Sequence, residues 1–346
     1  MRRWIVGFLI LLGLVMPVDA ASVTAPPAPD AAEVLVPEQP ETFSEGLTTV
    51  LREALDYLYP AFRSAAATCF GITAVILLAS LVQNLPGATQ KVTDMVATVT
   101  VALMLLSPSG VLIRLGTNTV TEISEYGKLL LPVMTAAMAA QGGTATSAAL
   151  YTGTAFFDAL LSGIIASVIV PMIYIFLCLS VASCATGEEI LGKMVSFVKW
   201  AMTWCLKIIL YVFTGYMGIT GVVSGATDAA AIKATKLTIS GMVPVVGGIL
   251  SDASEAVLIS AGLVKSAVGV YGVLVIIALW LRPFIEIGVQ YLMLKATAGI
   301  CSMFGAKAPV KLISSFSGAM GMLLAMTGSV SVLLMVSVVC LMRGVA

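Results

Sequence analysis

Long apolar runs follow one another along most of this chain and predict an all-α, polytopic membrane protein. The runs lie at residues 65–83, 93–113, 156–185, 195–223, 264–294 and 312–341. A transmembrane helix needs about 20 consecutive apolar residues, so each run can cross a bilayer. Single crossings give six spans. If the longer runs, with a proline in the middle of residues 156–185, are hairpins instead, the number rises toward eight.

Residues 42–60 carry the most regular amphipathic pattern of the chain. Apolar residues recur there at three- and four-residue spacing, Thr42 and Glu45 fit a capping box, and Pro60 is expected to stop the helix. We expect this helix to lie on the membrane or on the outer surface of the protein itself. The alternative is a docking helix for a partner outside the membrane.

The first 41 residues read as a targeting signal and a linker. Residues 1–20 combine Arg2 and Arg3 with a short apolar stretch and small residues before Ala21, which predicts a cleaved secretory signal peptide. An uncleaved anchor is the alternative. Residues 21–41 are acidic and proline-rich, as expected for an extended extracytoplasmic linker, and residues 21–64 as a whole are expected outside.

An internal duplication is suggested by residue pairs that recur 112 positions apart. Pro132 recurs as Pro244, Pro171 as Pro283, and Lys199 as Lys311. We therefore divide the membrane part into a first transmembrane pair, 61–128, and two repeats, 129–240 and 241–346. Matched prolines in two halves are typical of transporters with broken helices. The Gly-, Ala- and Thr-rich residues 129–150 read better as a re-entrant or interfacial element than as a full crossing. The candidate broken-helix or conduit residues are Pro132, Pro244, Pro171, Pro283, Gly142, Gly143, Gly247 and Gly248.

Composition supports the membrane assignment and narrows the chemistry. Hydrophobic residues make up 59% of the 346, charged residues 10%, and the mean hydropathy is +1.06. Lys plus Arg equals Asp plus Glu at 18 each, so no charge excess points to nucleic acid. Histidine is absent, and the six cysteines form no C-x-x-C pair. No metal and no cofactor are therefore expected.

Sequence motifs for catalysis are also missing. The chain has neither a G-x-x-x-x-G-K-[S/T] phosphate loop nor a G-x-S-x-G elbow. We therefore expect that this protein is not an enzyme, and that any ATPase activity coupled to it comes from another chain.

Charged residues inside the apolar runs are candidates for function, because charge is costly in lipid. They are Asp158, Lys207, Arg282 and Glu286. Arg282 and Glu286 are four residues apart and can pair on one helix face. The alternatives are a pathway role, simple pairing within a helix bundle, and snorkelling of Lys207 or Arg282 to the membrane interface.

A family resemblance rests on the second repeat. The segment from Pro244 to Glu255, continued by 261–265 and 269–272, resembles the stage III sporulation protein AE family of endospore-forming bacteria. The resemblance covers roughly residues 40–346. It implies a mother-cell membrane protein facing the forespore, within a complex that connects the two cells and is needed for late forespore gene expression. Other membrane subunits, and an ATPase from another chain, would be its partners, and the family supplies no catalytic residues.

Three functions fit these observations. The favoured one is a membrane subunit of the mother cell–forespore channel complex that forms or lines a permease-like conduit. The others are an autonomous secondary transporter of a small solute and a non-conducting membrane scaffold of the complex. The lysines at 91, 193–199 and 295–311 place those segments inside by the positive-inside tendency. Lys295, Lys307 and Lys311 mark the loop before the last run. Assembly as a homo-oligomer stays open.

Overall fold

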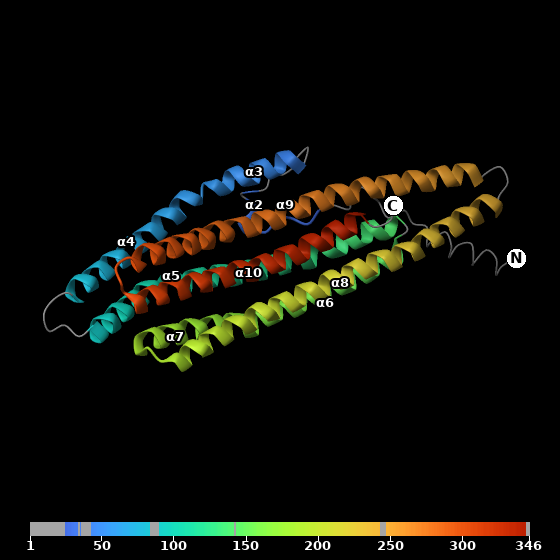
Figure 1. The fold of residues 1–346 in the computed structure, drawn as a ribbon. Helices are drawn as coiled ribbons and strands as arrows, with labels where there is room; N and C mark the ends of the chain where they lie inside the picture. Colours follow the sequence, from blue (N-terminus) through green and yellow to red (C-terminus); the bar gives the residue numbers. More distant parts are fainter. Residues whose placement is uncertain are drawn as a thin grey trace.

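The computed structural model describes residues 25–33, 35, 43–83, 90–141, 143–242 and 247–343, with only the helical backbone described between 221 and 265. Within these ranges the protein is all-helical and contains no strand. The helices are α2 (Asp30–Glu33), α3 (Phe43–Leu55), α4 (Leu58–Gln83), α5 (Gln90–Ala140), α6 (Thr144–Ile164), α7 (Val170–Thr186), α8 (Glu189–Met242), α9 (Gly247–Ser302) and α10 (Lys307–Arg343). The long helices run roughly along one common direction (Figure 1).

Six helical stretches of the described chain are long and apolar enough to cross a membrane, which confirms the lower of the two expected numbers. They are Phe43–Gln83, Gln90–Ala140, Thr144–Thr186, Glu189–Thr220, Ser266–Ser302 and Lys307–Met342. Helices α6 and α7 are joined by a π-helical turn, Ile165–Ile169, which ends two residues before Pro171. The widened turn accommodates a proline that lacks an N–H and clashes with the preceding turn. Residues 144–186 therefore form one continuous helical stretch, not a hairpin.

The prediction of a helix break at Pro132 is wrong. Helix α5 continues through both Pro108 and Pro132, and ends eight residues after the second. An interior proline costs about 3 kcal/mol, but the neighbouring Leu130 and Met134 are fully buried and hold the helix in place. The segment expected to be re-entrant instead forms the end of α5, a turn at Gln141, and the start of α6.

The other candidate broken-helix positions fall in different places. Gly143 directly precedes α6, and Gly247 is the first residue of α9, followed by Gly248. Pro283 lies inside α9 without interrupting it, and Pro171 lies in the first turn of α7. Gly142 and Pro244 lie outside the described residues. The prolines therefore mark no common break within the described chain.

Two tight turns join helices in the two predicted repeats. Gly187 ends α7 with φ 76°, and Gly305 lies between α9 and α10 with φ 79°. Glycine suits both positions because other residues rarely adopt the left-handed conformation. Lys311, expected in the loop before the last run, instead lies near the beginning of α10, and Lys199 lies near the beginning of α8.

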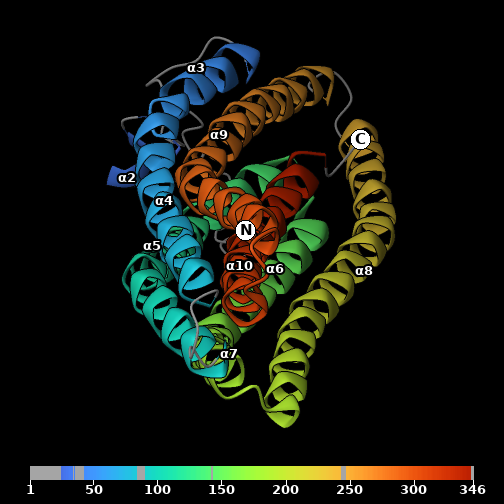
Figure 2. The same cartoon turned by 60° about the vertical axis from the view of Figure 1, so that its left-hand side comes forward.

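The hydrophobic core is centred on α5, α9 and α10, which pack closely on one another. Figure 2 shows α4 and α5 on one side of α9 and α10, and α8 on the other. Buried side chains of α10 include Phe316, Leu323 and Leu334, all fully inaccessible. Helix α8 packs mainly against α6 and α7, and only lightly against α10. It is therefore the peripheral helix of the described bundle.

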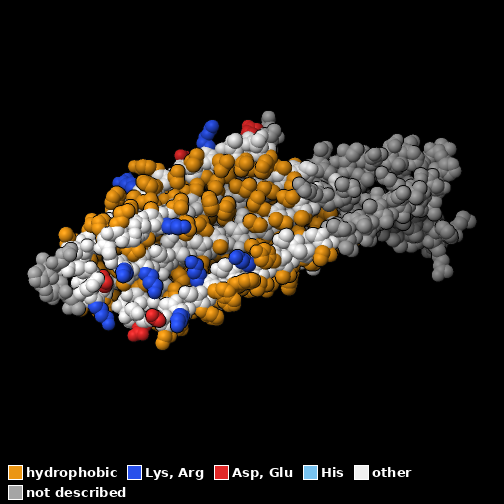
Figure 3. All heavy atoms as spheres, in the orientation of Figure 1, with side chains coloured by type: hydrophobic (Ala, Val, Ile, Leu, Met, Phe, Trp, Pro, Cys, Tyr) orange, Lys and Arg blue, Asp and Glu red, His pale blue; other side chains and the backbone are white. Residues whose placement is uncertain are grey.

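Helix α3 packs on α9 through Val50 and Ala54, while Leu51 and Leu55 stay exposed. Pro60 does not stop this helix, which already ends at Leu55. The proline is the third residue of α4, within the first turn, where it costs no helical hydrogen bond. Hydrophobic side chains cover much of the outer surface of the bundle (Figure 3), as expected for contact with lipid.

Candidate functional site: a groove lined by lysines

A groove open to the outside runs between α8 and α10, with α9 contributing to its middle. It consists of three adjoining cavities of about 270, 660 and 350 Å³. Lys199 and Gly318 line both the first and the second, while Thr203, Met322 and Ala325 line both the second and the third. We call this continuous feature the lysine groove.

The α8 wall of the lysine groove carries Lys199, Thr203 and Lys207. These residues are four apart, so they share one face of the helix. Lys207 was expected to be a buried charge within a span. Its side chain is exposed, and it lines the groove alongside Leu206 and Leu210.

The α10 wall consists largely of small residues, and their lack of bulk leaves the groove open. They recur at alternating spacings of four and three, which keeps them on one helix face. They are Ser314, Gly318, Gly321, Ala325 and Gly328. This stripe was not among the residues predicted from the sequence, although its spacing is visible in the chain.

The groove is positively charged. Besides Lys199 and Lys207 it is lined by Lys295 and Lys311, and none of the described lining residues is acidic. Lys295 Nζ donates a hydrogen bond to Tyr291 Oη at 3.3 Å. Figure 3 shows Lys and Arg side chains in a row over α8 and α10, within a surface that is otherwise largely hydrophobic.

This row of charges is unusual for a surface that faces lipid. Lys207 belongs to the apolar stretch Glu189–Thr220, which can cross a membrane. A lysine at the centre of a bilayer costs about 2.5–3.5 kcal/mol on insertion scales, and such residues usually face a bundle interior or a water-filled cavity. The lysine groove is therefore poorly suited to contact with bare lipid.

Asp158 lies in a different place, buried between α6 and α5. Its Oδ2 accepts a hydrogen bond from Ser124 Oγ at 2.5 Å. One turn earlier on α6, Thr154 Oγ1 donates to Ser337 Oγ of α10 at 2.9 Å. Because both contacts join neighbouring helices and neither residue lines the groove, the geometry gives Asp158 a role in helix packing.

Arg282 and Glu286 form an ion pair on α9, with Nε and Oε1 3.0 Å apart. The Arg282 guanidinium also lies 5.1 Å from the centre of the Tyr57 ring, which links α9 to the turn before α4. Glu286 faces a separate cavity of about 380 Å³ between α4, α5 and α9. This pair satisfies its own charges, away from the lysine groove.

Comparison with known proteins assigns the family. A family model described as "Stage III sporulation protein AE" matches residues 38–344. The chain belongs to the stage III sporulation protein AE family.

A member of this family from Bacillus subtilis (strain 168), named stage III sporulation protein AE, is 24% identical over 237 residues. That match covers 68% of this chain and 59% of the relative, so this chain matches less than two thirds of the relative's length. No solved structure matches the chain. The family resemblance expected from the second repeat is thus confirmed. The present chain is thus a membrane protein of this family, with six candidate spans in its described part.

Proposed function

We propose that this protein is the multi-span membrane subunit of a channel complex between mother cell and forespore, and that the lysine groove is one wall of its conduit. Family membership supports the place in sporulation. The observation that carries the conduit is the row of lysines along an open groove within the membrane-spanning helices.

The groove becomes a conduit when something covers its open side. Helices α8 and α10 supply two walls, and a second copy of the chain or another membrane subunit supplies the rest. Water would then solvate Lys199 and Lys207 at membrane depth, which removes most of the cost of placing them there. An energy source such as an ATPase belongs to another chain, and we propose no catalytic role for this one.

The orientation we propose follows the charges. The turns before α8 and before α10 lie close to Lys193 and Lys307, which suits the inner, mother-cell side of the membrane. With six crossings, residues 21–64 and the end of α10 then lie on the opposite side, toward the forespore.

A scaffold role without conduction is the second candidate, because α3 presents exposed Leu51 and Leu55 that could bind another subunit. The two candidates differ in what they require of Lys207. A scaffold does not need its charge, whereas a water-filled groove that guides solutes does.

The test is Lys207→Leu in the native host, scored by a late forespore reporter and by the amount of protein in the membrane. The conduit predicts loss of reporter activity at a normal protein level, with partial rescue by Lys207→Arg. Lys193→Leu is the matched control, since it makes the same change in an exposed residue of the same helix outside the groove. Normal sporulation with Lys207→Leu would contradict the conduit and favour the scaffold.

A further inference from the structure

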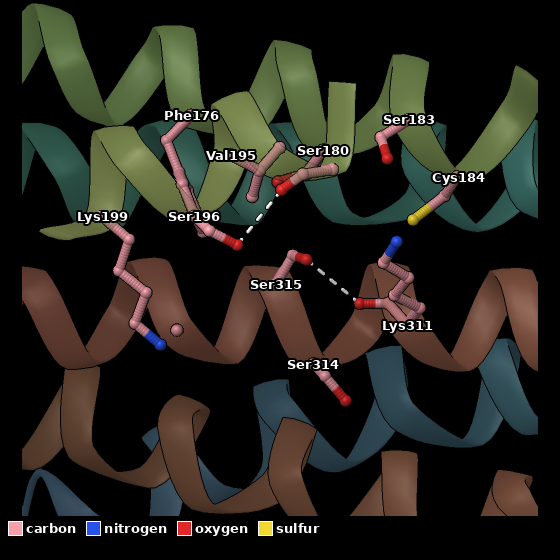
Figure 4. Close-up of a pocket in the computed structure, with 12 residues that line it drawn as sticks. Phe176, Ser180, Ser183, Cys184, Val195, Ser196, Lys199, Lys311, Ser314 and Ser315 are labelled. Atoms are coloured by element: carbon pink, nitrogen blue, oxygen red, sulfur yellow. Dashed lines mark hydrogen bonds between the residues drawn. The ribbon is translucent and has the colours of Figure 1, made fainter. Parts of the chain in front are cut away.

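The end of the lysine groove nearest the α7–α8 turn is a distinct pocket of about 270 Å³. Helices α7, α8 and α10 surround it, and its polar lining consists of two lysines, five serines and a cysteine: Lys199, Lys311, Ser180, Ser183, Ser196, Ser314, Ser315 and Cys184. Figure 4 shows these side chains around one space. All of these groups are, or can act as, hydrogen-bond donors, so the pocket favours a ligand rich in acceptors.

The two lysines reach across the pocket in opposite directions. Lys199 extends from α8 toward α10, and a Cβ placed on Gly318 would lie 3.6 Å from its Nζ. Lys311 extends from α10 toward α7, and a Cβ placed on Gly192 of α8 would lie 3.4 Å from its Nζ. Figure 4 shows both ammonium groups directed into the space between the helices. Two cations thus face one pocket, Lys199 at the level of Gly318 and Lys311 at the level of Gly192, and no described lining residue supplies a carboxylate.

Two serines of α7 that line the pocket have buried hydroxyls without a hydrogen-bond partner. Ser180 and Ser183 are 1% and 3% exposed, and neither hydroxyl has a hydrogen-bond partner. The hydroxyls of Ser196 and Ser315, by contrast, donate to the carbonyls of Gly192 and Lys311. Buried hydroxyls without partners are rare in proteins, because each one loses its hydrogen bonds to water. Here both line the same pocket as the two lysines, and a Cβ placed on Gly192 would lie 3.5 Å from Ser183 Oγ and 3.4 Å from Lys311 Nζ.

We infer that this pocket binds a phosphate group. A tetrahedral oxyanion offers acceptors in several directions, which matches donors that arrive from three helices, and lysine is a common phosphate ligand. The volume is slightly below the range of about 300–1,000 Å³ typical of pockets for drug-sized ligands, so it suits a phosphate head rather than a larger ligand. The phosphate belongs either to a lipid headgroup or to a small soluble phosphate ester. This inference does not depend on conduction through the groove.

Gly192 provides the sharpest variant. An alanine methyl group there would project toward Lys311 Nζ and Ser183 Oγ, at 3.4 and 3.5 Å, and would occupy space needed by the ligand. These distances are compatible with folding, and alanine favours a helix more than glycine does. Gly192→Ala should therefore keep the fold and weaken binding. Gly215→Ala is the matched control, because a Cβ there meets nothing within 4 Å on the same helix.

The experiment uses the full chain purified in detergent at low salt. Binding of inorganic phosphate is measured by calorimetry, and retention of phosphatidylglycerol by native mass spectrometry, with a galactolipid of the same acyl chains as the phosphate-free control. Lys199→Gln and Lys311→Gln should each weaken binding by about ten- to hundredfold, as expected for a lost charge-assisted hydrogen bond. Lys193→Gln should leave it unchanged.

The possible outcomes either support phosphate binding in this pocket or overturn it. Inorganic phosphate binding that is lost in the Gly192, Lys199 and Lys311 variants supports the pocket with a soluble ligand. Retention of phosphatidylglycerol over the galactolipid, lost in the same variants, supports it with a lipid headgroup. Equal retention of both lipids together with no phosphate binding, or binding unchanged by Gly192→Ala and both lysine variants, overturns the proposal. Ser183→Ala is an additional test, because it removes a buried hydroxyl that has no hydrogen-bond partner. It should raise the melting temperature of the ligand-free protein and weaken binding of the ligand.

Discussion

Helices α9 and α10 differ from helices α7 and α8 in how much of each pair the rest of the protein covers. In the most apolar windows of α9 and α10, 61% and 56% of the residues are buried, against 33% for the stretch containing α7 and 17% for α8. Both pairs contain a proline-bearing helix, a turn with a left-handed glycine and a lysine-bearing helix. Two helix pairs with similar local features therefore have different roles: α9 and α10 form the core, and α7 and α8 present a surface.

The largest difference should appear in the effect of removing an aromatic side chain. Phe316 of α10 is fully buried, while Phe197 of α8 is 64% exposed. We expect Phe316→Ala to lower the free energy of unfolding by about 3–5 kcal/mol through loss of packing and a residual cavity. Phe197→Ala should cost much less. Unfolding in mixed micelles measures both, and equal losses would contradict the assignment of α10 to the core.

The attachment of α8 to α6 should be sensitive to a single methyl group. Gly153 of α6 lies against the ring of Tyr216, whose hydroxyl donates to the Ala149 carbonyl at 2.9 Å. Gly153→Ala would force this ring away and should cost about 1–3 kcal/mol of unfolding free energy. Gly163→Ala, on the same helix with open space around it, serves as the control. Unchanged stability in both variants would mean that α8 is not held here.

A smaller effect is expected where α6 meets the core. The hydrogen bond from Thr154 of α6 to Ser337 of α10 joins two residues that are 183 positions apart in the sequence. Hydrogen bonds between membrane helices contribute about 0.6 kcal/mol on average and at most about 1.7 kcal/mol. A double-mutant cycle with Thr154→Val and Ser337→Ala should give a coupling in this range. Zero coupling would show that packing alone joins α6 to α10.

The smallest effect should come from the ion pair on α9. Arg282 and Glu286 have side chains 45% and 26% exposed, so solvent or headgroups screen their attraction. We expect a coupling of about 0.2–1 kcal/mol between Arg282→Gln and Glu286→Gln in unfolding experiments. A much larger coupling would place this pair in a drier environment than its exposure indicates, and would return Glu286 to the list of functional candidates.

The spans could be predicted from the sequence because their length and hydropathy are local properties. The same holds for the Arg282–Glu286 pair, which depends only on a spacing of four. The path of α5 through Pro132 could not be predicted in this way, since tertiary burial of Leu130 and Met134 offsets the local penalty. Lys311, expected in a loop, lies in a helix because α10 begins at Lys307, earlier than the apolar run that starts at residue 312.

The lysine groove itself depends on contacts that no single segment encodes. Lys199, Lys207 and Lys311 were each visible, but their common location requires α8 to lie beside α10. The partnerless hydroxyls of Ser180 and Ser183 become informative only once burial is known. One signal was noted but not used to predict a site: the 112-residue offset between Lys199 and Lys311 links two residues that line one pocket.

The central claim is that the lysine groove faces water within the membrane. The most direct measurement is labelling of Lys207→Cys with a membrane-impermeant maleimide in proteoliposomes, after replacement of the six native cysteines. Ile208→Cys is the comparison, because Ile208 is 52% exposed and does not line the groove. We predict rapid labelling at position 207 and little at position 208. Equal protection of both positions would contradict a water-filled groove.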